Sequence, residues 1–458
     1  MFKLNINLIF AILTFVCPVK SALIHEFNEK IKISVFAFGA KGDGFSDDAS
    51  AFKQAFKYCV DNNLVCEVPQ TKVAYNIGST VQILLKPGQS LKIVSNGAII
   101  KPLKIFQNHS AYNLTLFQEH IFFSIGAVID NLSEKMYERS KGSNISVSGL
   151  VFDGENLKAT FAPQSYNTHI FIGLQALGDN VNIQKCVFRN IFGYGIRLHN
   201  ITYAQLDQNL FKNVGGRGAT LFAQKADKDA FGDALYFALI KKGGKIDIKN
   251  CELIGMKNNG KRSRSGITFE YSIAPYTVNL KNIKISGYAK SVHIEESSPT
   301  LIYFSNVRMD DFNFGIANVL NNKSQLFLKQ VKMEIGETDK NDSGDALAFL
   351  NYKSTAQIFI ENSYLNFKGR YQGYQSAVGL VKVSNSTING NSTNFFFADG
   401  NTTFYNCKFI NFGGSGISFF SHTGIGTYKI MNSQFINCQI IKSLEGRLKL
   451  ILKNNTKH

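Results

Sequence analysis

The sequence predicts an all-β protein, a right-handed parallel β-helix solenoid with a capping helix at its N-terminal end. Two observations predict this fold: an alternating pattern that recurs eleven times, with asparagine or glutamine at a fixed place, and a second recurring strand that begins with a small residue. Alternation with a period of two is typical of a β-strand. The shortest repeat spacing, 21 to 24 residues, suits three short strands and three turns. Units of this size that repeat many times stack into a solenoid.

The recurring pattern alternates apolar and polar residues, then places an asparagine-like residue fifth and a small or apolar residue sixth. Its copies begin at Ile145, Val181, Ala204, Ile246, Val278, Ile302, Leu326, Ile358, Val381, Thr402 and Tyr428. The fifth position holds Gln208, Asn250, Asn282, Asn306, Gln330, Asn362, Asn385, Asn406 and Asn432. Stacked coils place equivalent residues about 4.8 Å apart. We therefore expect these amides to hydrogen-bond in a ladder and to satisfy a bent backbone.

The second recurring strand defines one outer face of the solenoid. Its copies are Gly195–His199, Gly218–Phe222, Gly266–Glu270, Ser291–Glu295, Gly315–Val319 and Gly416–Phe420. Alternate residues of a strand point to opposite sides. The outward pairs on four consecutive rungs are then Arg197 with His199, Thr220 with Phe222, Thr268 with Glu270, and His293 with Glu295. The next rung offers only Ala317 and Val319, so the polar patch ends there.

The first residues carry the marks of an export signal. Lys3 precedes an apolar stretch over Leu8–Val16, and small residues follow at Ser21 and Ala22. The apolar stretch falls short of the roughly 20 residues that a membrane span needs. We predict a signal peptide over residues 1–21, a secreted or periplasmic protein, and no membrane span in the mature chain.

The remaining chain is predicted to form one domain. We expect a single β-helix over residues 22–440, whose first part, 22–70, forms the N-terminal cap region. Residues after about 440 no longer match the repeat, and 441–458 are expected to form a basic tail of undefined role.

The cysteines divide into two groups. Six of the seven follow the predicted signal. Cys186, Cys251 and Cys407 occupy the sixth repeat position, which predicts small buried residues and no disulfide between rungs two coils apart. Cys59 and Cys66 are close enough in sequence to close a small loop, which export permits. No pattern of His and Cys has zinc-site spacing, so no transition-metal site is indicated.

The N-terminal segment has a more specific pattern. Residues 33–56 read as a strand, a glycine-rich turn and an amphipathic helix, whose start is marked by Ser46, Asp47 and Asp48 as capping residues. Such a segment would close the open end of a solenoid, where unpaired strand edges invite aggregation.

The stretch Phe38-Gly-Ala-Lys-Gly-Asp-Gly-Phe-Ser-Asp-Asp-Ala resembles the N-terminal signature of the pectate-lyase-like superfamily, which includes family-28 glycoside hydrolases, related lyases and phage tailspike depolymerases. The resemblance implies a parallel β-helix and a structural role for Asp43, Asp47 and Asp48. The paired aspartates and Gly-His-Gly strand of polygalacturonases are not found here, nor is the Arg-x-Pro-x-x-Arg element of pectate lyases. No catalytic residue is therefore carried over from the family.

The charge balance points to an acidic partner. Lys and Arg number 50 against 33 Asp and Glu, which gives a formal charge of +17 that is spread along the chain. Because the chain carries an export signal, an anionic polysaccharide is favoured over nucleic acid. The sequence defines neither the sugar nor the oligomeric state.

Glu270 and Glu295 are the main catalytic candidates, with His293 as the third. Their equivalent positions on adjacent rungs predict carboxylates about 5 Å apart. Two like charges at that distance repel, so one carboxyl is expected to hold its proton. A separation of about 5 to 5.5 Å suits a retaining glycosidase. The alternatives are solvated glutamates neutralised by Lys or Arg, and a Ca²⁺ site, although no cofactor is required.

Two long repeat spacings place predicted substrate-binding loops beside this pair. From Leu206 to Ile248 is 42 residues and from Ile248 to Leu280 is 32. Long loops on a rigid scaffold commonly bind ligands. The candidate substrate-binding residues are Arg197, His199, Phe222, Asp227, Asp229, Asp233, Lys261, Arg262, Arg264 and Tyr271. The basic ones would clamp uronate, sulfate or phosphate groups and the aromatic ones would stack on sugars, whereas a plain solvated loop and simple packing are the alternatives.

Three functions follow from these residues. The first is a glycoside hydrolase that uses Glu270 and Glu295. The second is a polysaccharide lyase that acts by β-elimination on a uronic-acid polymer, with His293, His199 or Tyr271 as the base. The third is a non-catalytic glycan-binding or adhesion β-helix, because a fold does not decide function.

Overall fold

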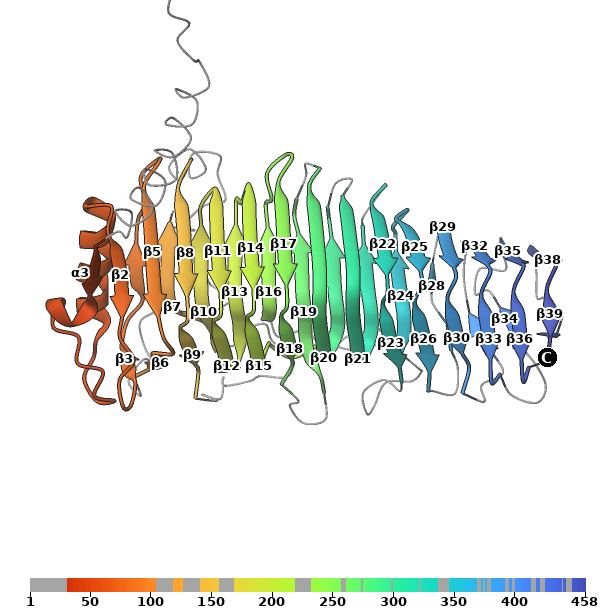
Figure 1. Cartoon of the computed structure of the whole chain (residues 1–458), viewed down its shortest axis with the longest axis horizontal. Coiled ribbons are helices and arrows are strands. Elements are labelled where there is room, and N and C mark those ends of the chain that lie inside the picture. The colour runs from red at the N-terminus through yellow and green to blue at the C-terminus, as the bar shows by residue number, and fades with distance from the viewer. Residues whose placement is uncertain are drawn as a thin grey trace, which may run out of the picture.

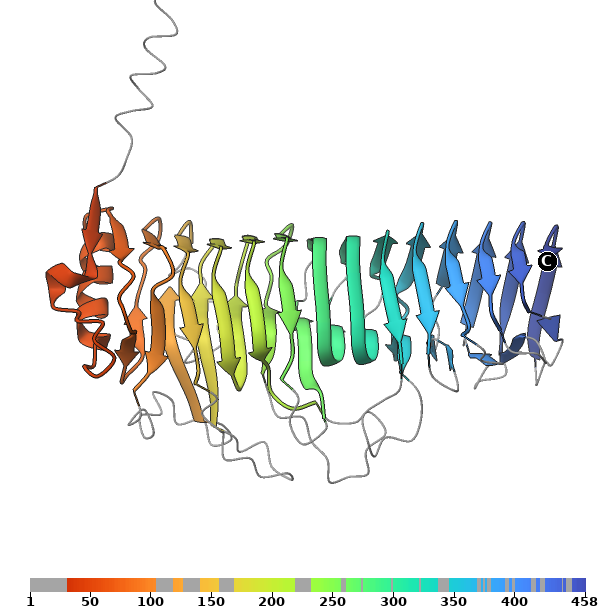
Figure 2. The ribbon, with the colours of Figure 1, turned by 60° about the horizontal axis from the view of Figure 1, so that its bottom comes forward.

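The computed structural model describes most of the chain after residue 30. The described residues are 31–103, 118–126, 141–155, 169–218, 232–256, 261–272, 275–297, 300–320, 323–336, 346–368, 372–373, 375–376, 380–391, 395–397, 400–412, 417–420, 425–438, 440–441 and 447–458. The predicted signal peptide lies outside them. Figures 1 and 2 show one elongated stack of strands, with α3 (Ala49–Asp61) at one end and the C-terminus at the other.

Three ladders of parallel strands form the sides of the stack, and we name them faces A, B and C in the order in which the chain visits them. Face A contains β1 (Lys32–Ser34), β2 (Val65–Val68), β5 (Ser90–Ser95), β8 (Asn144–Ser148), β11 (Asn180–Gln184), β14 (Tyr203–Asp207), β17 (Lys245–Lys249), the first parts of β20 (Thr277–Glu295) and β21 (Leu301–Val319), β22 (Gln325–Lys329), β25 (Gln357–Glu361), β29 (Leu380–Ser384), β32 (Gly400–Tyr405), β35 (Ile425–Met431) and β38 (Arg447–Lys453). The eleven predicted repeat copies fall on its successive strands from β8 to β35, which confirms the repeat.

Face B follows face A in each coil. It contains β3 (Tyr75–Ile77), β6 (Ile99–Pro102), β9 (Val151–Asp153), β12 (Val187–Ile191), β15 (Leu210–Val214), β18 (Glu252–Ile254), the middle of β20 and β21, β23 (Lys332–Ile335), β26 (Tyr364–Phe367), β30 (Thr387–Asn389), β33 (Lys408–Ile410), β36 (Gln434–Ile436) and β39 (Thr456–Lys457).

Face C completes the coil. It contains β4 (Val81–Ile83), β7 (Gln118–Gly126), β10 (His169–Leu177), β13 (Gly193–His199), β16 (Asp233–Ala238), β19 (Ser263–Glu270), the last parts of β20 and β21, β24 (Leu347–Tyr352) and β28 (Gln375–Ser376). A separate small sheet joins β27 (Gln372–Gly373), β31 (Phe395–Phe397), β34 (Ile417–Phe420) and β37 (Ile440–Ile441). This arrangement is a parallel β-helix, and its right-handed winding stays a prediction from the general preference of parallel connections.

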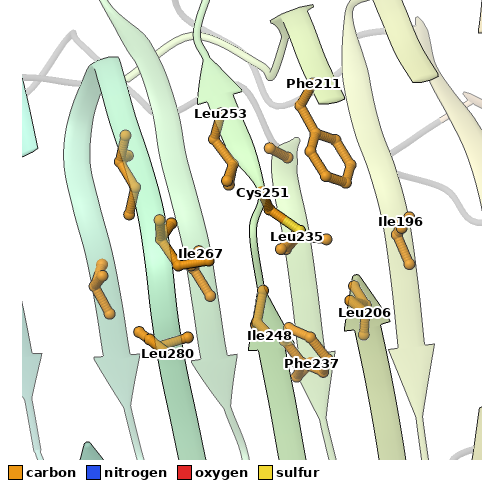
Figure 3. Close-up of a cluster of buried hydrophobic side chains, with 14 of the residues drawn as sticks. Ile196, Leu206, Phe211, Leu235, Phe237, Ile248, Cys251, Leu253, Ile267 and Leu280 are labelled. Carbon is orange, nitrogen blue, oxygen red and sulfur yellow. The ribbon is translucent and has the colours of Figure 1, made fainter. Parts of the chain in front are cut away.

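The interior is filled by the inward residues of all three faces. Leu206, Ile248 and Leu280 are aligned on three successive rungs of face A and are buried (Figure 3). Phenylalanines on face B stack in the same way, since the rings of Phe188 and Phe211 lie 5.0 Å apart and almost parallel. Equivalent residues on neighbouring rungs therefore pack directly on one another.

The predicted amide ladder forms at the turn from face A to face B. The Asn282 side-chain nitrogen donates to Asn250 Oδ1 at 2.9 Å, and Asn306 donates to Asn282 at 3.0 Å. All three residues have left-handed backbones, with φ between 52° and 56°. Asparagine tolerates this conformation better than most residues. A second asparagine column, missed by the sequence analysis, includes Asn190 and Asn213 at the turn from face B to face C.

The helix α3 begins where the N-terminal pattern places it. Asp47 accepts hydrogen bonds from the backbone N–H groups of Ala49 and Gly78, and Asp48 accepts from Lys41 and Gly42, so these acids hold the glycine-rich turn. Ser46 donates to Asp43 and does not cap α3. The buried side of α3 packs on the stack, with the Phe56 ring 5.3 Å from that of Phe123 on face C.

Two further expectations concern the cysteines and the C-terminus. Cys186, Cys251 and Cys407 are buried free thiols, as predicted, and Cys59 and Cys66 are also free thiols and close no loop. Residues 447–453, expected in a basic tail, form β38, which pairs in register with β35 on face A. The parallel array thus runs past the expected boundary at 440. Within the described residues, no helix combines the length and the apolar character that crossing a bilayer requires.

We expect the substitution Asn282→Ala to lower the free energy of unfolding by about 1–3 kcal/mol, because it removes two ladder hydrogen bonds and leaves a left-handed backbone without asparagine. Asn282→Gly should lose less, since glycine accepts this backbone. Denaturant unfolding measures both. The neighbouring exposed Lys281→Ala is the control, expected to change stability by less than about 0.5 kcal/mol; an equal loss in Lys281→Ala and Asn282→Ala would contradict the ladder's role.

Candidate functional site

The outward residues of face C form two columns across the rungs. One column aligns Arg197, Tyr236, Thr268, His293 and Ala317, and the next aligns His199, Ala238, Glu270, Glu295 and Val319. Glu270 and Glu295 therefore lie directly beside each other on adjacent rungs, as predicted. The patch also ends at Ala317 and Val319, as predicted.

One rung of the predicted patch was assigned to the wrong segment. The strand between β13 and β19 is β16, so the outward residues there are Tyr236 and Ala238 in place of Thr220 and Phe222. The segments 218–222 and 233–238 both alternate in polarity after a glycine, so local pattern did not distinguish them. Phe222, Asp227 and Asp229 lie outside the described residues.

The centre of the candidate site is a histidine between two carboxylates. His293 Nε2 lies 2.8 Å from Glu295 Oε2 and 3.5 Å from Glu270 Oε1. Because an ionised carboxylate only accepts hydrogen bonds, Nε2 must carry a hydrogen. Nδ1 of His293 is buried without a hydrogen-bond partner in the described part of the chain. The Glu270 side chain is 6% exposed and that of Glu295 is 29% exposed, so Glu295 is the more accessible carboxylate.

Arg264 anchors this group from the buried side. Its Nη1 lies 2.7 Å from Asp233 Oδ2 and its Nη2 lies 3.0 Å from Glu270 Oε1, and all three side chains are buried. Asp233 and Arg264, which were expected in ligand-binding loops, lie instead in the strands β16 and β19. Arg264 forms ion pairs with both Asp233 and Glu270, so its guanidinium is already partnered by two carboxylates.

The electrostatics of the two glutamates differ from the expectation. Burial by itself would raise the pKa of Glu270, but the charge of Arg264 and the hydrogen bond with His293 outweigh it and hold the pKa below the ordinary 4.5. The hydrogen bond with His293 also lowers the pKa of Glu295. The prediction that repulsion makes one glutamate hold its proton is therefore wrong, because Arg264 pairs with Glu270 and His293 contacts both carboxylates. Burial raises the pKa of Asp233.

Arg197 and His199 lie on the first rung of the patch. Arg197 Nε donates to Gln175 Oε1 at 2.8 Å, and its guanidinium lies 5.5 Å from the centre of the Tyr194 ring. His199 is buried, and burial lowers its pKa to about 3, so its ring is neutral at neutral pH. The contacts with Gln175 and Tyr194 hold the Arg197 side chain on the face.

Of the basic residues predicted to bind an anionic ligand, Arg262 is buried and paired, whereas Lys261 is partly exposed. Arg262 pairs with Asp311 at 2.9 Å and donates to Asn313 at 2.5 Å, and it is almost fully buried. Lys261 is partly exposed, two residues before β19 begins. Tyr271 directly follows Glu270, is 47% exposed, and has a left-handed backbone. Burial and the nearby glutamates raise the pKa of Tyr271.

Tyr236 is a site residue that the sequence analysis missed. It is buried, its ring meets that of Tyr194 edge-on at 5.3 Å, and burial together with the charge of Glu270 raises its pKa. The sequence did hold a signal for Tyr236: its neighbours Leu235 and Phe237 are apolar and point into the core, so strand alternation would place Tyr236 on the outer side.

A calcium ion does not fit this group well. Glu270, His293 and Glu295 offer two carboxylates and one nitrogen within 4.8 Å of one another. Calcium takes six to eight oxygen ligands. One oxygen of Glu270 is also held by Arg264. The described residues therefore supply fewer oxygen donors than this ion prefers.

The comparisons with known proteins concern the fold. No model of a known protein family matches the chain, and no curated protein matches its sequence. Solved structures do match. The surface adhesin PfbA of Streptococcus pneumoniae is 16% identical, with a TM-score of 0.50, over 89% of this chain and 90% of that one. The A-module of mannuronan C-5 epimerase AlgE6 from Azotobacter vinelandii is 12% identical, with a TM-score of 0.53, over 93% and 99%.

A third match is a variant catalytic domain of a family-87 α-1,3-glucanase in complex with nigerose. It is 16% identical, with a TM-score of 0.52, over 84% of this chain and 67% of that one. At these identities the likeness shows the fold. The chain has the parallel β-helix fold, in agreement with the pectate-lyase-like resemblance of its N-terminal segment.

We expect Arg264→Leu to lower the free energy of unfolding by about 3–5 kcal/mol, because Asp233 and Glu270 would be left buried without their cation. Denaturant unfolding at neutral pH measures the change. The matched control is Arg308→Leu, which breaks an exposed pair with Asp310 and should cost less than about 1 kcal/mol. Similar losses in the two variants would show that Arg264 does not support buried charge.

The lowered pKa of Glu270 predicts a pH dependence of stability. A carboxyl whose pKa is lower in the folded than in the unfolded state contributes stability above the unfolded value, and this contribution is lost as the pH falls through the folded value. Below the ordinary pKa of 4.5, the wild-type protein should therefore lose stability more steeply than Glu270→Gln. Parallel pH profiles would contradict the assignment.

Proposed function

We propose that this protein is a carbohydrate-active β-helix that hydrolyses glycosidic bonds of an acidic polysaccharide on face C. The observation that supports it best is the contact of His293 with Glu295 and Glu270. A ring nitrogen of His293 and one carboxylate oxygen of each glutamate lie within 4.8 Å of one another. One carboxylate is accessible and the other is buried behind it. The named substrates of two structures with the same fold, mannuronan and α-1,3-glucan, are also polysaccharides.

Glu295 is the proposed nucleophile. It is partly exposed, and its lowered pKa keeps it ionised, as an attacking carboxylate must be. A Glu295 oxygen forms a bond to the anomeric carbon while the bond from that carbon to the glycosidic oxygen breaks. His293, in its doubly protonated form, gives its Nε2 proton to the departing oxygen and becomes a neutral imidazole. Water then attacks the anomeric carbon, gives a proton back to His293, and releases Glu295.

Glu270 and Arg264 act as positioning residues in this scheme. Glu270 contacts Nε2 of His293 from the buried side, and Arg264 holds Glu270 in place. The imidazole thus keeps its orientation without needing support from the substrate.

An anionic polymer is the proposed substrate. The formal charge of +17 attracts polyanions, and Lys261, just before β19, is partly exposed. Tyr271 offers an exposed ring beside the two glutamates for contact with a sugar. We place the protein outside the cytoplasm, secreted or periplasmic, on the basis of the signal predicted over residues 1–21.

β-Elimination on a uronic-acid polymer is the second candidate. Two observations favour it: the pKa of both glutamates is lowered, so neither is a carboxylic acid at neutral pH, and Tyr271 places a phenol beside them. In this case His293 or Tyr271 would remove the proton next to the uronate carboxylate, and a cation would neutralise that carboxylate.

We expect Glu295→Gln and His293→Ala each to slow cleavage of an acidic polysaccharide by about 10²–10⁴-fold, because they remove the nucleophile and the proton donor. The assay follows new reducing ends together with ultraviolet absorbance, which reports the double bond that only a lyase makes. The exposed neighbour Glu296→Gln is the control and should keep full activity.

Unchanged cleavage in Glu295→Gln and His293→Ala would show that the proposed site does not carry out the reaction. If the wild type makes products that absorb in the ultraviolet, the protein is a lyase and the proposed hydrolysis is wrong. Binding of the polymer without cleavage would favour the adhesion alternative.

We expect a chelator such as EDTA to leave both cleavage and thermal stability unchanged, because the described donors do not meet the oxygen count of calcium. The measurement compares the protein with and without EDTA, followed by added Ca²⁺. Loss with EDTA and recovery with Ca²⁺ would show that the ion is required.

A further inference from the structure

Face A carries an exposed aromatic groove, on a different face of the stack from the candidate site. The groove has a volume of about 510 Å³ and crosses five rungs, from β21 to β32. Its aromatic residues are Tyr303, Phe327, Phe359 and Tyr405. The rings of Tyr303 and Phe327 lie 5.0 Å apart at an angle of 12°, and those of Phe327 and Phe359 lie 5.0 Å apart at 10°. They form an overlapping array along the solenoid.

These rings are not required by the core. The adjacent residues Phe304, Leu328 and Ile360 point inward and are buried, whereas Tyr303 is 38% exposed. On the preceding rungs the same column holds Asn182, Gln205, Asp247 and Asn279, and on the following rungs it holds Lys382, Thr403 and Lys429. Between β5 and β35 the column is therefore polar except at three consecutive rungs. Large apolar side chains gathered on an exposed surface mark binding sites more often than isolated ones do.

The margin of the groove is cationic. Lys329 and Lys382 line it, against a single acid, Glu361. Lys382 Nζ lies 5.8 Å from the centre of the Phe359 ring, at the end of the aromatic array. A ligand that fits this surface has flat apolar parts and negative charge beside them.

We propose that this groove is a second binding site, for a segment of an anionic polysaccharide. Sugar rings present apolar C–H surfaces that suit aromatic rings, while uronate or sulfate groups pair with Lys382 and Lys329. A volume of about 510 Å³ lies within the range of 300–1,000 Å³ that is usual for ligand sites. A groove of this size is better matched to a few sugar units than to a second protein.

The proposal rests on the proposed function only for the class of ligand, because it uses no residue of face C. In the chain, β20 ends on face C at Glu295 and β21 begins on face A at Leu301. The groove and the candidate site therefore belong to neighbouring faces of one rigid stack. A polymer held in the groove would be presented to face C at a raised effective concentration.

The test measures binding of the full chain to alginate, polygalacturonate and heparin, with neutral dextran as the comparison. The main variant is the double substitution Phe327→Thr and Phe359→Thr, since threonine occupies the same column at position 403 and suits a strand. The aromatic control on the same face is Tyr203→Thr. The charge variant is Lys382→Gln, and its control in the same column is Lys429→Gln.

We expect the double variant to weaken binding of at least one acidic polymer by about tenfold or more. Lys382→Gln should weaken the same binding and reduce its dependence on salt. Both controls should bind as the wild type does, and thermal melting verifies that the variants fold. Dextran should bind far more weakly than the acidic polymer.

Unchanged affinity in both groove variants would overturn the proposal, as would equal binding of dextran or no binding of any acidic polymer by the wild type. Sedimentation of the wild type as a dimer and of the folded double variant as a monomer would assign the groove to self-association instead. Glu295→Gln separates the two proposals. If it abolishes cleavage but binds normally while the groove variants bind weakly, both hold; if the groove variants lose binding and the wild type cleaves nothing, only the groove holds.

Discussion

In-register stacking of parallel rungs is the constraint on which the rest of this structure depends. Each residue meets its counterparts one rung before and one rung after, about 4.8 Å away. The amide ladder through Asn250, Asn282 and Asn306, the stacked phenylalanines of face B and the paired glutamates of face C all follow from it. A shift of one residue would send inward side chains outward, so the alternating pattern strongly specifies the register.

The same stacking creates an electrostatic problem at the candidate site. Placing Glu270 beside Glu295 brings two negative charges together, with one of them buried. The molecule places His293 between the carboxylates and Arg264 behind them, and Arg264 also contacts Asp233. A buried ion pair adds little net stability, because desolvation opposes the attraction. Its main effect here is to hold a histidine and an accessible carboxylate in a defined arrangement.

In the two proposals, the solenoid would separate chemistry from binding by placing them on different faces. Each column on an outer face is an independent row of side chains, so a few rungs can change from polar to aromatic without altering the interior. Face C uses this freedom for titratable groups around Glu295, and face A uses it for the aromatic array around Phe327. A positively charged chain with two such surfaces is suited to a long anionic ligand.

The sequence by itself determined the fold, the repeat and the adjacency of Glu270 and Glu295, because all three depend on local alternation and on equivalent positions in successive coils. The sequence did not decide which segment fills the rung before β19, since 218–222 and 233–238 have similar local patterns. It also could not show that β38 continues face A, or that Arg264 lies beneath Glu270 as a partner of Asp233. Ion-pair partners, burial and the direction of a pKa shift depend on distances between segments separated along the chain. Only the stacking of the folded coils sets those distances.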